Sequence, residues 1–148
     1  MMKTRAYSKK VRAGKVLCII LAVMLAALGL GGCSSTKLAE AFDEAAVKEA
    51  AQAAVDHLNA GEYEECVAMM SQEMQEALSA EALASAAEGV FAKAGAFQEY
   101  KSVAVVGQKD KAGTDYAVAV VVADFENGKV TYNVSFDTNM EIVGFWMK

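Results

Sequence analysis

A run of 15 apolar residues from Val16 to Leu30 decides which part of this chain can form a folded domain. The residues before this run carry six lysines and arginines and no acid. A basic segment, a short apolar run and then small residues form the pattern of a secretory signal peptide. A retained transmembrane helix is the alternative, but it needs about 20 apolar residues to cross the hydrocarbon layer. We therefore expect a cleaved signal over residues 1–32 and export of the rest of the chain.

The apolar run ends in the sequence Leu30-Gly31-Gly32-Cys33. This stretch resembles the bacterial lipobox, in which a Leu and two small residues precede a Cys. The resemblance implies that a signal peptidase recognises Leu30, Gly31 and Gly32 and that Cys33 receives a diacylglyceryl thioether, which carries two acyl chains such as palmitate. Two chains anchor a protein stably, whereas one chain gives only marginal, reversible binding. The expectation is a lipoprotein on the extracytoplasmic face of the cell membrane; an ordinary signal peptide with an unrelated Cys is the alternative.

The chain after Gly32 is strongly acidic. Removal of the first 32 of the 148 residues leaves 116, the size of one domain. The removed charges are all basic, so 8 Lys and Arg face 19 Asp and Glu, for a net charge of −11. This balance argues against nucleic acid as a partner, because phosphates need a basic surface. It also means that membrane lipid would be held through the acylated Cys33, without help from the domain's charge.

The composition offers few groups for metal or redox chemistry. Cys66 has no partner once Cys33 is acylated, so we expect a buried, inert thiol and no intrachain disulfide. The single histidine, His57, and this lone thiol give no zinc-ligand spacing, and we expect no metal and no cofactor. A His near a helix C-terminus favours the helix dipole when it is charged. A structural role is expected for His57, with a general base as the alternative.

The first half of the acidic chain predicts helices. Asp43 is a typical N-cap, apolar residues then recur at helical spacing, and Gly61 suits the left-handed position after a helix. These signals predict a helix over 44–59. Further helices are expected over 62–70, after the N-cap residues Ser71 and Ser79, and up to Gly95.

After Gly95 the spacing of apolar residues changes from the helical period to alternation, which is typical of strands. Asn127-Gly128 predicts a hairpin with a type I′ turn. Helices followed by an antiparallel meander indicate an α+β domain. We expect a curved four-stranded sheet wrapped around a helical layer as a cone, in a single domain over 43–148 joined to Cys33 by a tether over 33–42. Strands are expected over 97–106, 116–125, 130–136 and 142–147, with a turn at 137–139.

Four short stretches of the domain carry a family resemblance. They are Gly61-Glu62-Tyr63-Glu64, Gly95-Ala96-Phe97, Phe125-Glu126-Asn127-Gly128 and Ile142-Val143-Gly144-Phe145. Together they resemble the bacterial family called domain of unknown function 3887, over nearly all of 43–148. The resemblance implies a fold similar to nuclear transport factor 2, to SnoaL-like enzymes and to cystatin-like cones. It also implies export or lipid anchoring in Gram-positive bacteria, and it supplies no catalytic residues.

Five side chains are candidates for a pocket in such a cone. Tyr100, Tyr116, Tyr132 and Trp146 would line its mouth, although aromatic residues at strand spacing are also typical of a core. Asp124 shares the larger apolar face of its strand with Tyr116. A carboxylate in such surroundings has a raised pKa and suits a general base, whereas its position at the strand's end favours a structural, solvent-exposed role.

Two classes of function are compatible with these observations. The first is a non-enzymatic lipoprotein module that binds a small ligand, a peptide or an envelope protein. The alternative is an isomerase- or dehydratase-like enzyme that uses a pocket carboxylate. Two convergent polar groups on the floor of the cone would favour the enzyme, and a filled or apolar interior would favour binding or a structural role. Whether the domain forms a homodimer stays open.

Overall fold

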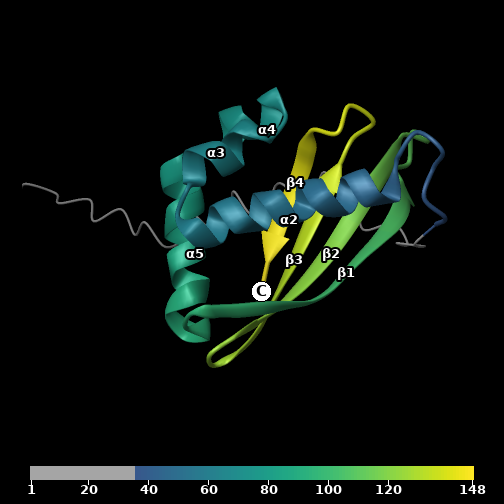
Figure 1. The fold of residues 1–148 in the computed structure, drawn as a ribbon. Coiled ribbons are helices and arrows are strands. Elements are labelled where there is room, and N and C mark those ends of the chain that lie inside the picture. The colour runs from purple at the N-terminus through teal and green to yellow at the C-terminus, as the bar shows by residue number, and fades with distance from the viewer. Residues whose placement is uncertain (1–35) are drawn as a thin grey trace, which may run out of the picture. The chain divides into compact units, whose positions relative to one another are not determined.

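The computed structural model describes residues 36–148. The predictions on the signal peptide and on Leu30, Gly31, Gly32 and Cys33 lie outside the described residues. The chain divides between Gly32 and Cys33 into two units, and the described residues belong to the second. In residues 36–148, helices come first and a four-stranded antiparallel sheet comes after them, which confirms the predicted α+β class (Figure 1).

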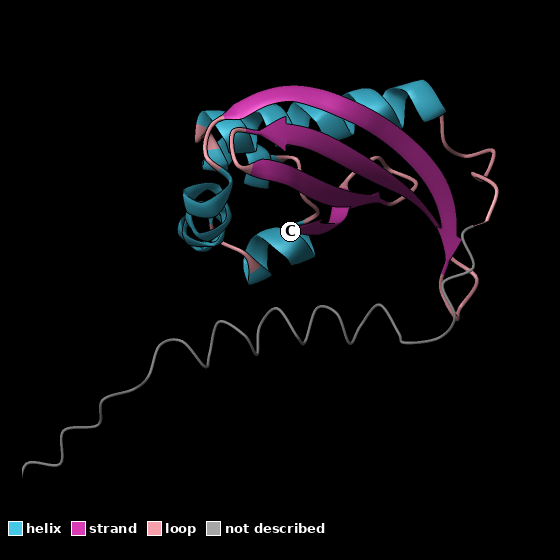
Figure 2. Ribbon diagram, turned by 90° about the horizontal axis from the view of Figure 1, so that it is seen from below, coloured by secondary structure: helices cyan, strands magenta, loops and turns pink. Residues whose placement is uncertain are grey.

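The helices are α2 (Glu44–Ala60), α3 (Tyr63–Ala68), α4 (Gln72–Ala77) and α5 (Ala80–Ala94). The strands are β1 (Phe97–Lys109), β2 (Asp115–Phe125), β3 (Gly128–Phe136) and β4 (Ile142–Met147). Neighbours in sequence are neighbours in the sheet, in the order β1-β2-β3-β4. The strands are strongly curved, as Figure 2 shows. β1 runs three residues beyond its predicted end, because it stays paired with β2 as far as Lys109 opposite Asp115.

The helix ends depend on local hydrogen bonds that the sequence predicts. Asp43 Oδ1 accepts the backbone N–H of Ala46 at 2.8 Å, so the first turn of α2 has its cap. Gly61 adopts the left-handed conformation with φ of 78° and donates its N–H to carbonyls of the last turn. Both predictions are confirmed. The hydroxyls of Ser71 and Ser79 cap α4 and α5 in the same way.

The core lies between α2 and the face of the sheet that carries small residues. Ala119 and Val121 of β2 are fully buried on this face, whereas Val118 and Val120 point to the other face and are half-buried. Small side chains let a helix approach a sheet closely, as the sequence predicts. The buried residues that α2 contributes are Val47, Ala51, Ala54, Val55 and Leu58.

The hairpin between β2 and β3 forms at the predicted place but with a different turn. Phe125 pairs with Gly128, so the loop consists of Glu126 and Asn127. The positive φ belongs to Gly128, at 150°, and not to Asn127. The type I′ prediction is therefore wrong, because that turn needs positive φ at both central residues. Asn127 instead donates its backbone N–H to the carbonyl of Ala94 at 2.8 Å, which ties the hairpin to the end of α5.

The segment before α2 packs against the sheet, where the sequence predicts a spacer. Thr36 and Gly107 exchange two backbone hydrogen bonds, of 2.9 and 3.0 Å, at the outer edge of β1. Phe42, at the end of the same segment, is buried. The pairing covers part of an edge strand that would otherwise present free N–H and C=O groups. No helix of residues 36–148 has the length and apolarity to cross a membrane.

Cys66 on α3 is buried and unpaired, as predicted. Burial raises the pKa of its thiol from 9.0 to about 11, so thiolate is scarce near neutral pH. In a mature chain that carries Cys33→Ser, we expect a thiol reagent to modify native Cys66 about 100-fold more slowly than the urea-unfolded chain. Unfolding also releases this proton between pH 9 and 11, so Cys66 lowers stability as pH rises through that window. Equal labelling rates before and after unfolding would contradict the burial.

Candidate functional site

The structure places the five predicted pocket residues on opposite faces of the sheet. Tyr100 and Tyr132 lie on the face that α2 covers, whereas Tyr116, Asp124 and Trp146 lie on the other face. Alternate residues of a strand point to alternate faces, and the helices cover the alanine-rich face. The five side chains therefore do not line one pocket, and only the two tyrosines under α2 belong to a common site.

Asp124 takes part in an ion-pair cluster on the outer face. Its Oδ2 lies 3.1 Å from Nζ of Lys101, which also lies 2.6 Å from Oε1 of Glu99. The hydrogen bonds that Lys101 donates, to Glu99 first and then to Asp124, raise the pKa of its ammonium group. This carboxylate thus faces a cation across the sheet surface and points away from the interior of the cone.

Two hydrogen bonds join the inner tyrosines to the last turns of α2. Tyr100 donates its hydroxyl to Oδ1 of Asp56 at 2.5 Å, and Tyr132 donates to Oδ1 of Asn59 at 3.0 Å. Asp56 and Asn59 lie three residues apart and therefore on one side of the helix. Burial raises the pKa of both phenols, and the nearby Asp56 carboxylate raises that of Tyr100 further. Both hydroxyls consequently stay protonated and act as donors.

Each of these four side chains makes one hydrogen bond within the bridge. Tyr132 is fully buried, and the Nδ2 atom of Asn59 is buried without a partner among residues 36–148. Apart from this bridge, the described interior is apolar and has no buried polar or charged residue. The arrangement fixes the distance between α2 and the sheet, because each tyrosine reaches from its strand to the helix.

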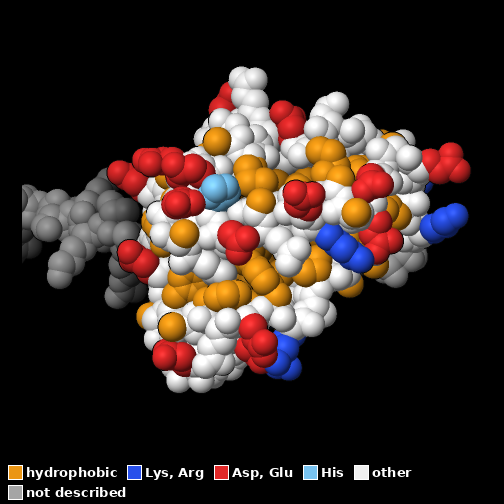
Figure 3. Space-filling model, in the orientation of Figure 1, with side chains coloured by type: hydrophobic (Ala, Val, Ile, Leu, Met, Phe, Trp, Pro, Cys, Tyr) orange, Lys and Arg blue, Asp and Glu red, His pale blue; other side chains and the backbone are white. Residues whose placement is uncertain are grey.

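An aromatic cluster borders this bridge and reaches the surface. We call Phe91, Phe97, Tyr100 and Phe125 the aromatic lip. Phe91 stacks on Phe125 at 5.6 Å between ring centroids, and Phe97 meets Phe125 and Tyr100 edge to face at 5.7 and 5.1 Å. Phe97 is 37% exposed. Figure 3 shows a band of apolar side chains between α2 and β1 on this side, with acidic side chains next to it.

His57 lies beside Glu62 and takes no part in the tyrosine bridge. Its Nδ1 is 2.6 Å from Oε2 of Glu62, and its carbonyl accepts the backbone N–H of the same residue at 2.8 Å. The pair therefore closes the C-terminal end of α2, where a charged imidazole is favourable to the helix dipole. Among residues 36–148, no group of three or more His, Cys, Asp or Glu side chains is placed to hold a metal ion.

A second surface feature is a groove of about 340 Å³ between α5 and the β2–β3 hairpin. Lys93, Lys129 and Lys148 line it together with glycine, alanine, valine and asparagine. None of the three forms an ion pair within the part of the chain that the structure describes. Lys148 instead lies over the ring of Trp146, with Nζ 5.2 Å from the centroid. The groove shares no lining residue with the aromatic lip.

The sequence did not point to Asp56, Asn59 or the aromatic lip as a unit. No distinguishing signal was present, because Asp56 and Asn59 continue a polar side of α2 that includes Glu49 and Gln52 at spacings of three and four. The partners of Asp56 and Asn59 lie 44 and 73 residues further along the chain. No local pattern relates residues at such separations, so the bridge emerges only from the packed layers.

Comparison with known proteins places this fold in a family. The family described as "Protein of unknown function (DUF3887)" matches residues 51–145. The chain is also similar to a solved structure, "NMR structure of protein from Ruminococcus gnavus ATCC 29149", with a TM-score of 0.66 and 26% identity. That similarity covers 76% of this chain and 97% of the other. Among curated proteins, none matches this sequence. The family match spans more than half of the residues and confirms the predicted resemblance, so the chain belongs to the DUF3887 family.

Proposed function

We propose that this protein is a lipoprotein anchored through Cys33 to the outer face of the cell membrane, and that its domain binds a cationic polypeptide segment at the aromatic lip. The observation that carries the binding role is the exposed side chain of Phe97, held in an aromatic cluster beside the carboxylate of Asp56. Aromatic side chains are enriched at the energetic centre of protein interfaces.

The filled interior supports binding at the rim of the cone. Tyr132, Phe136 and Leu58 are fully buried between the layers, and they occupy the space that a substrate would need. An isomerase- or dehydratase-like site requires an acid or base that meets the substrate inside the pocket. Here Asp124 lies on the outer face and Asp56 accepts a hydrogen bond from Tyr100. The described contacts therefore favour recognition over that chemistry.

The charge of the domain supports a cationic partner. Residues 36–148 contain 19 acids and 8 Lys and Arg, and acidic side chains lie next to the apolar band in Figure 3. A field of this sign attracts positively charged segments and raises their rate of encounter. The basic groove at Lys93, Lys129 and Lys148 would repel the same partner, which makes it a matched control surface.

Photo-crosslinking in cells tests this proposal. A benzophenone amino acid in place of Phe97 is expected to form an adduct with a polypeptide of basic character, because Phe97 is exposed at the lip. The same amino acid in place of Lys129 is expected to form at least about tenfold less adduct. Asp56→Asn keeps an oxygen for Tyr100 but removes the charge, and it should reduce the Phe97 adduct about threefold, or about 0.6 kcal/mol. Equal adducts at both positions, or an acidic partner at position 97, would contradict the proposal.

A further inference from the structure

We infer that the β1–β2 turn, residues 110–114, is the end of the domain that faces the membrane, and that Lys37 and Lys111 there contact the phosphates of anionic lipid. This inference rests on the proposed acylation of Cys33. It adds an orientation to that proposal, because a lipid anchor by itself leaves a domain free to rotate on its tether.

The first observation is the attachment of the chain at Thr36. Its N–H donates to the carbonyl of Gly107 at 2.9 Å, and its carbonyl accepts the N–H of Gly107 at 3.0 Å. The anchor residue Cys33 precedes Thr36 by three residues, which span at most about 11 Å when fully extended. The lipid anchor would therefore be joined to the folded domain at the edge of β1, and not at the start of α2 at Glu44.

Gly107 shows that this attachment is built into the strand. A Cβ atom at position 107 would lie 2.4 Å from the carbonyl oxygen of Lys37 and 3.0 Å from Cα of Leu38. Both atoms belong to the backbone, so a larger residue would push the segment off the sheet. Glycine inside a strand often marks such a close approach of another backbone. Gly107 is buried and lies within the part of β1 that pairs with β2. Glycine destabilises a strand at such a position, because it loses more conformational entropy on folding than other residues.

The direction of the pairing points to one end of the sheet. Thr36 and Gly107 form an antiparallel bridge, so the described chain runs from Thr36 in the direction away from the β1–β2 turn. Lys109, the last residue of β1, lies two residues beyond Gly107, or about 7 Å. The anchor therefore enters beside the β1–β2 turn. Figure 1 shows this turn and the segment before α2 at the same end of the molecule.

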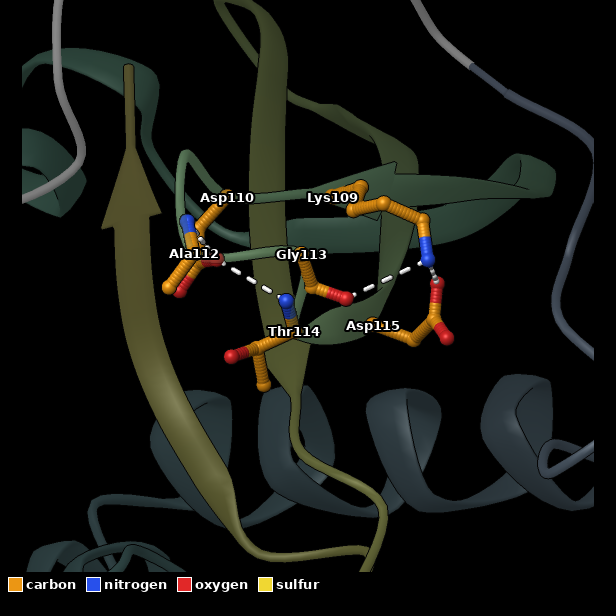
Figure 4. A network of polar contacts seen from close by, with 6 residues as sticks. All are labelled: Lys109, Asp110, Ala112, Gly113, Thr114 and Asp115. Atoms are coloured by element: carbon orange, nitrogen blue, oxygen red, sulfur yellow. Dashed lines mark hydrogen bonds and ion pairs between the residues drawn. The ribbon is translucent and has the colours of Figure 1, made fainter.

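The acids of this turn are satisfied by groups of the turn itself. Asp110 Oδ1 accepts the N–H groups of Ala112 and Thr114, at 2.8 and 2.9 Å, and Lys109 contacts Asp115 at 2.7 Å (Figure 4). The hydrogen bonds to Asp110, the one from Thr114 first, lower the pKa of its carboxyl group. Asp110 and Asp115 therefore already have partners within the turn and the adjoining strand end.

Two lysines at this end of the domain are available to bind an anionic group outside the protein. Lys37 and Lys111 are exposed and form no ion pair with any residue of 36–148. Lysines close to an anionic bilayer are attracted within about one Debye length, so these two suit the phosphates of a lipid surface.

The orientation separates the membrane from the proposed binding site. Phe97 begins β1 and Gly107 lies ten residues later, which corresponds to about 30 Å along a strand. The aromatic lip would then point away from the bilayer, toward partners in the surrounding envelope. The lysine groove at the β2–β3 hairpin lies at the same distal end, because Phe97 pairs with Phe125 beside that hairpin.

Fluorescence quenching on vesicles tests the orientation with the lipidated protein purified from cells. In a Cys66→Ser background the acylated Cys33 has no free thiol, so Ala112→Cys in the exposed β1–β2 turn or Lys129→Cys at the β2–β3 hairpin supplies a single labelling site. The labelled proteins are bound to vesicles of phosphatidylcholine and phosphatidylglycerol that contain a headgroup spin label. We expect quenching at position 112 to exceed that at position 129 at least about threefold, because quenching falls steeply over the length of β1.

Two further measurements distinguish a failure of the lipid anchor from a failure of the orientation alone. Gly107→Val should detach Thr36 and reduce the difference between positions 112 and 129, whereas Ala104→Val on the outer face of the same strand should leave it unchanged. A protein that does not float with the vesicles would overturn the lipid anchor and the orientation together. A protein that floats but is quenched equally at both positions, or more at 129, would overturn the orientation alone.

Discussion

Replacement of Cys33 by Ala is expected to abolish acyl labelling and to leave a precursor or a released, soluble chain. The thiol of Cys33 is the group that would carry the diacylglyceryl chains, and each buried CH₂ of an acyl chain contributes about 0.8 kcal/mol to membrane binding. The residues after Gly32 have a net charge of −11, which repels anionic lipid, so a few lysines would orient the domain but would not hold it there without the acyl chains. Metabolic labelling with an alkyne fatty acid, with fractionation of the cells, measures both effects.

Two cysteines in the same chain provide the controls for this prediction. Cys18 lies in the proposed signal peptide and Cys66 is buried in α3, so Cys18→Ala and Cys66→Ala should both label and fractionate like the unchanged protein. Acyl labelling that survives in Cys33→Ala would remove the lipoprotein proposal. Loss of labelling in Cys66→Ala would also count against it, because that thiol lies in the folded domain.

Phe136→Ala is expected to lower the free energy of unfolding by about 3–5 kcal/mol, which is a large part of the stability of a domain of this size. Phe136 ends β3, is fully buried, and pairs with Ala117 of β2 and Ile142 of β4. Truncation removes its apolar surface from the core and leaves a cavity where three strands and the helices meet. Urea unfolding of the mature chain with Cys33→Ser, monitored by circular dichroism, gives the difference.

Ser135→Ala is the matched control because Ser135 precedes Phe136 and points to the opposite face of the sheet. A change on that half-exposed surface should alter stability by no more than about 0.5 kcal/mol. Similar losses in the two variants would show that both faces of the sheet are buried, for example in a dimer. An unchanged midpoint in Phe136→Ala would contradict the placement of this ring in the core.

Much of the fold could be predicted because its signals are local. The caps at Asp43, Ser71 and Ser79 act over three residues, and Gly61 acts within one turn of α2. Alternation along β2 likewise separates an alanine-rich face from a valine-rich face without reference to the rest of the chain. Short-range hydrogen bonds and strand geometry depend on neighbouring residues, and a sequence lists those neighbours directly.

The candidate site was predicted only in part, because it depends on which face of the sheet is covered. Tyr100 and Tyr132 lie under α2 as a pocket residue should, but Tyr116, Asp124 and Trp146 lie on the outer face. The sequence showed that Asp124 shares a face with Tyr116, and this relation holds. The small side chains of the other face are compatible with a closely packed helix, but the sequence did not show that α2 is that helix.

The sequence by itself determined the acidic charge, the helix caps, the strand order and the candidate lipidation at Cys33. Only the tertiary structure decided that Tyr100 meets Asp56 and Tyr132 meets Asn59, across 44 and 73 residues. It also decided that Thr36 pairs with Gly107, which turns an expected spacer into a fixed attachment. These contacts join segments that are distant in the chain, and they form because the helices and the sheet can bury their apolar faces only against each other.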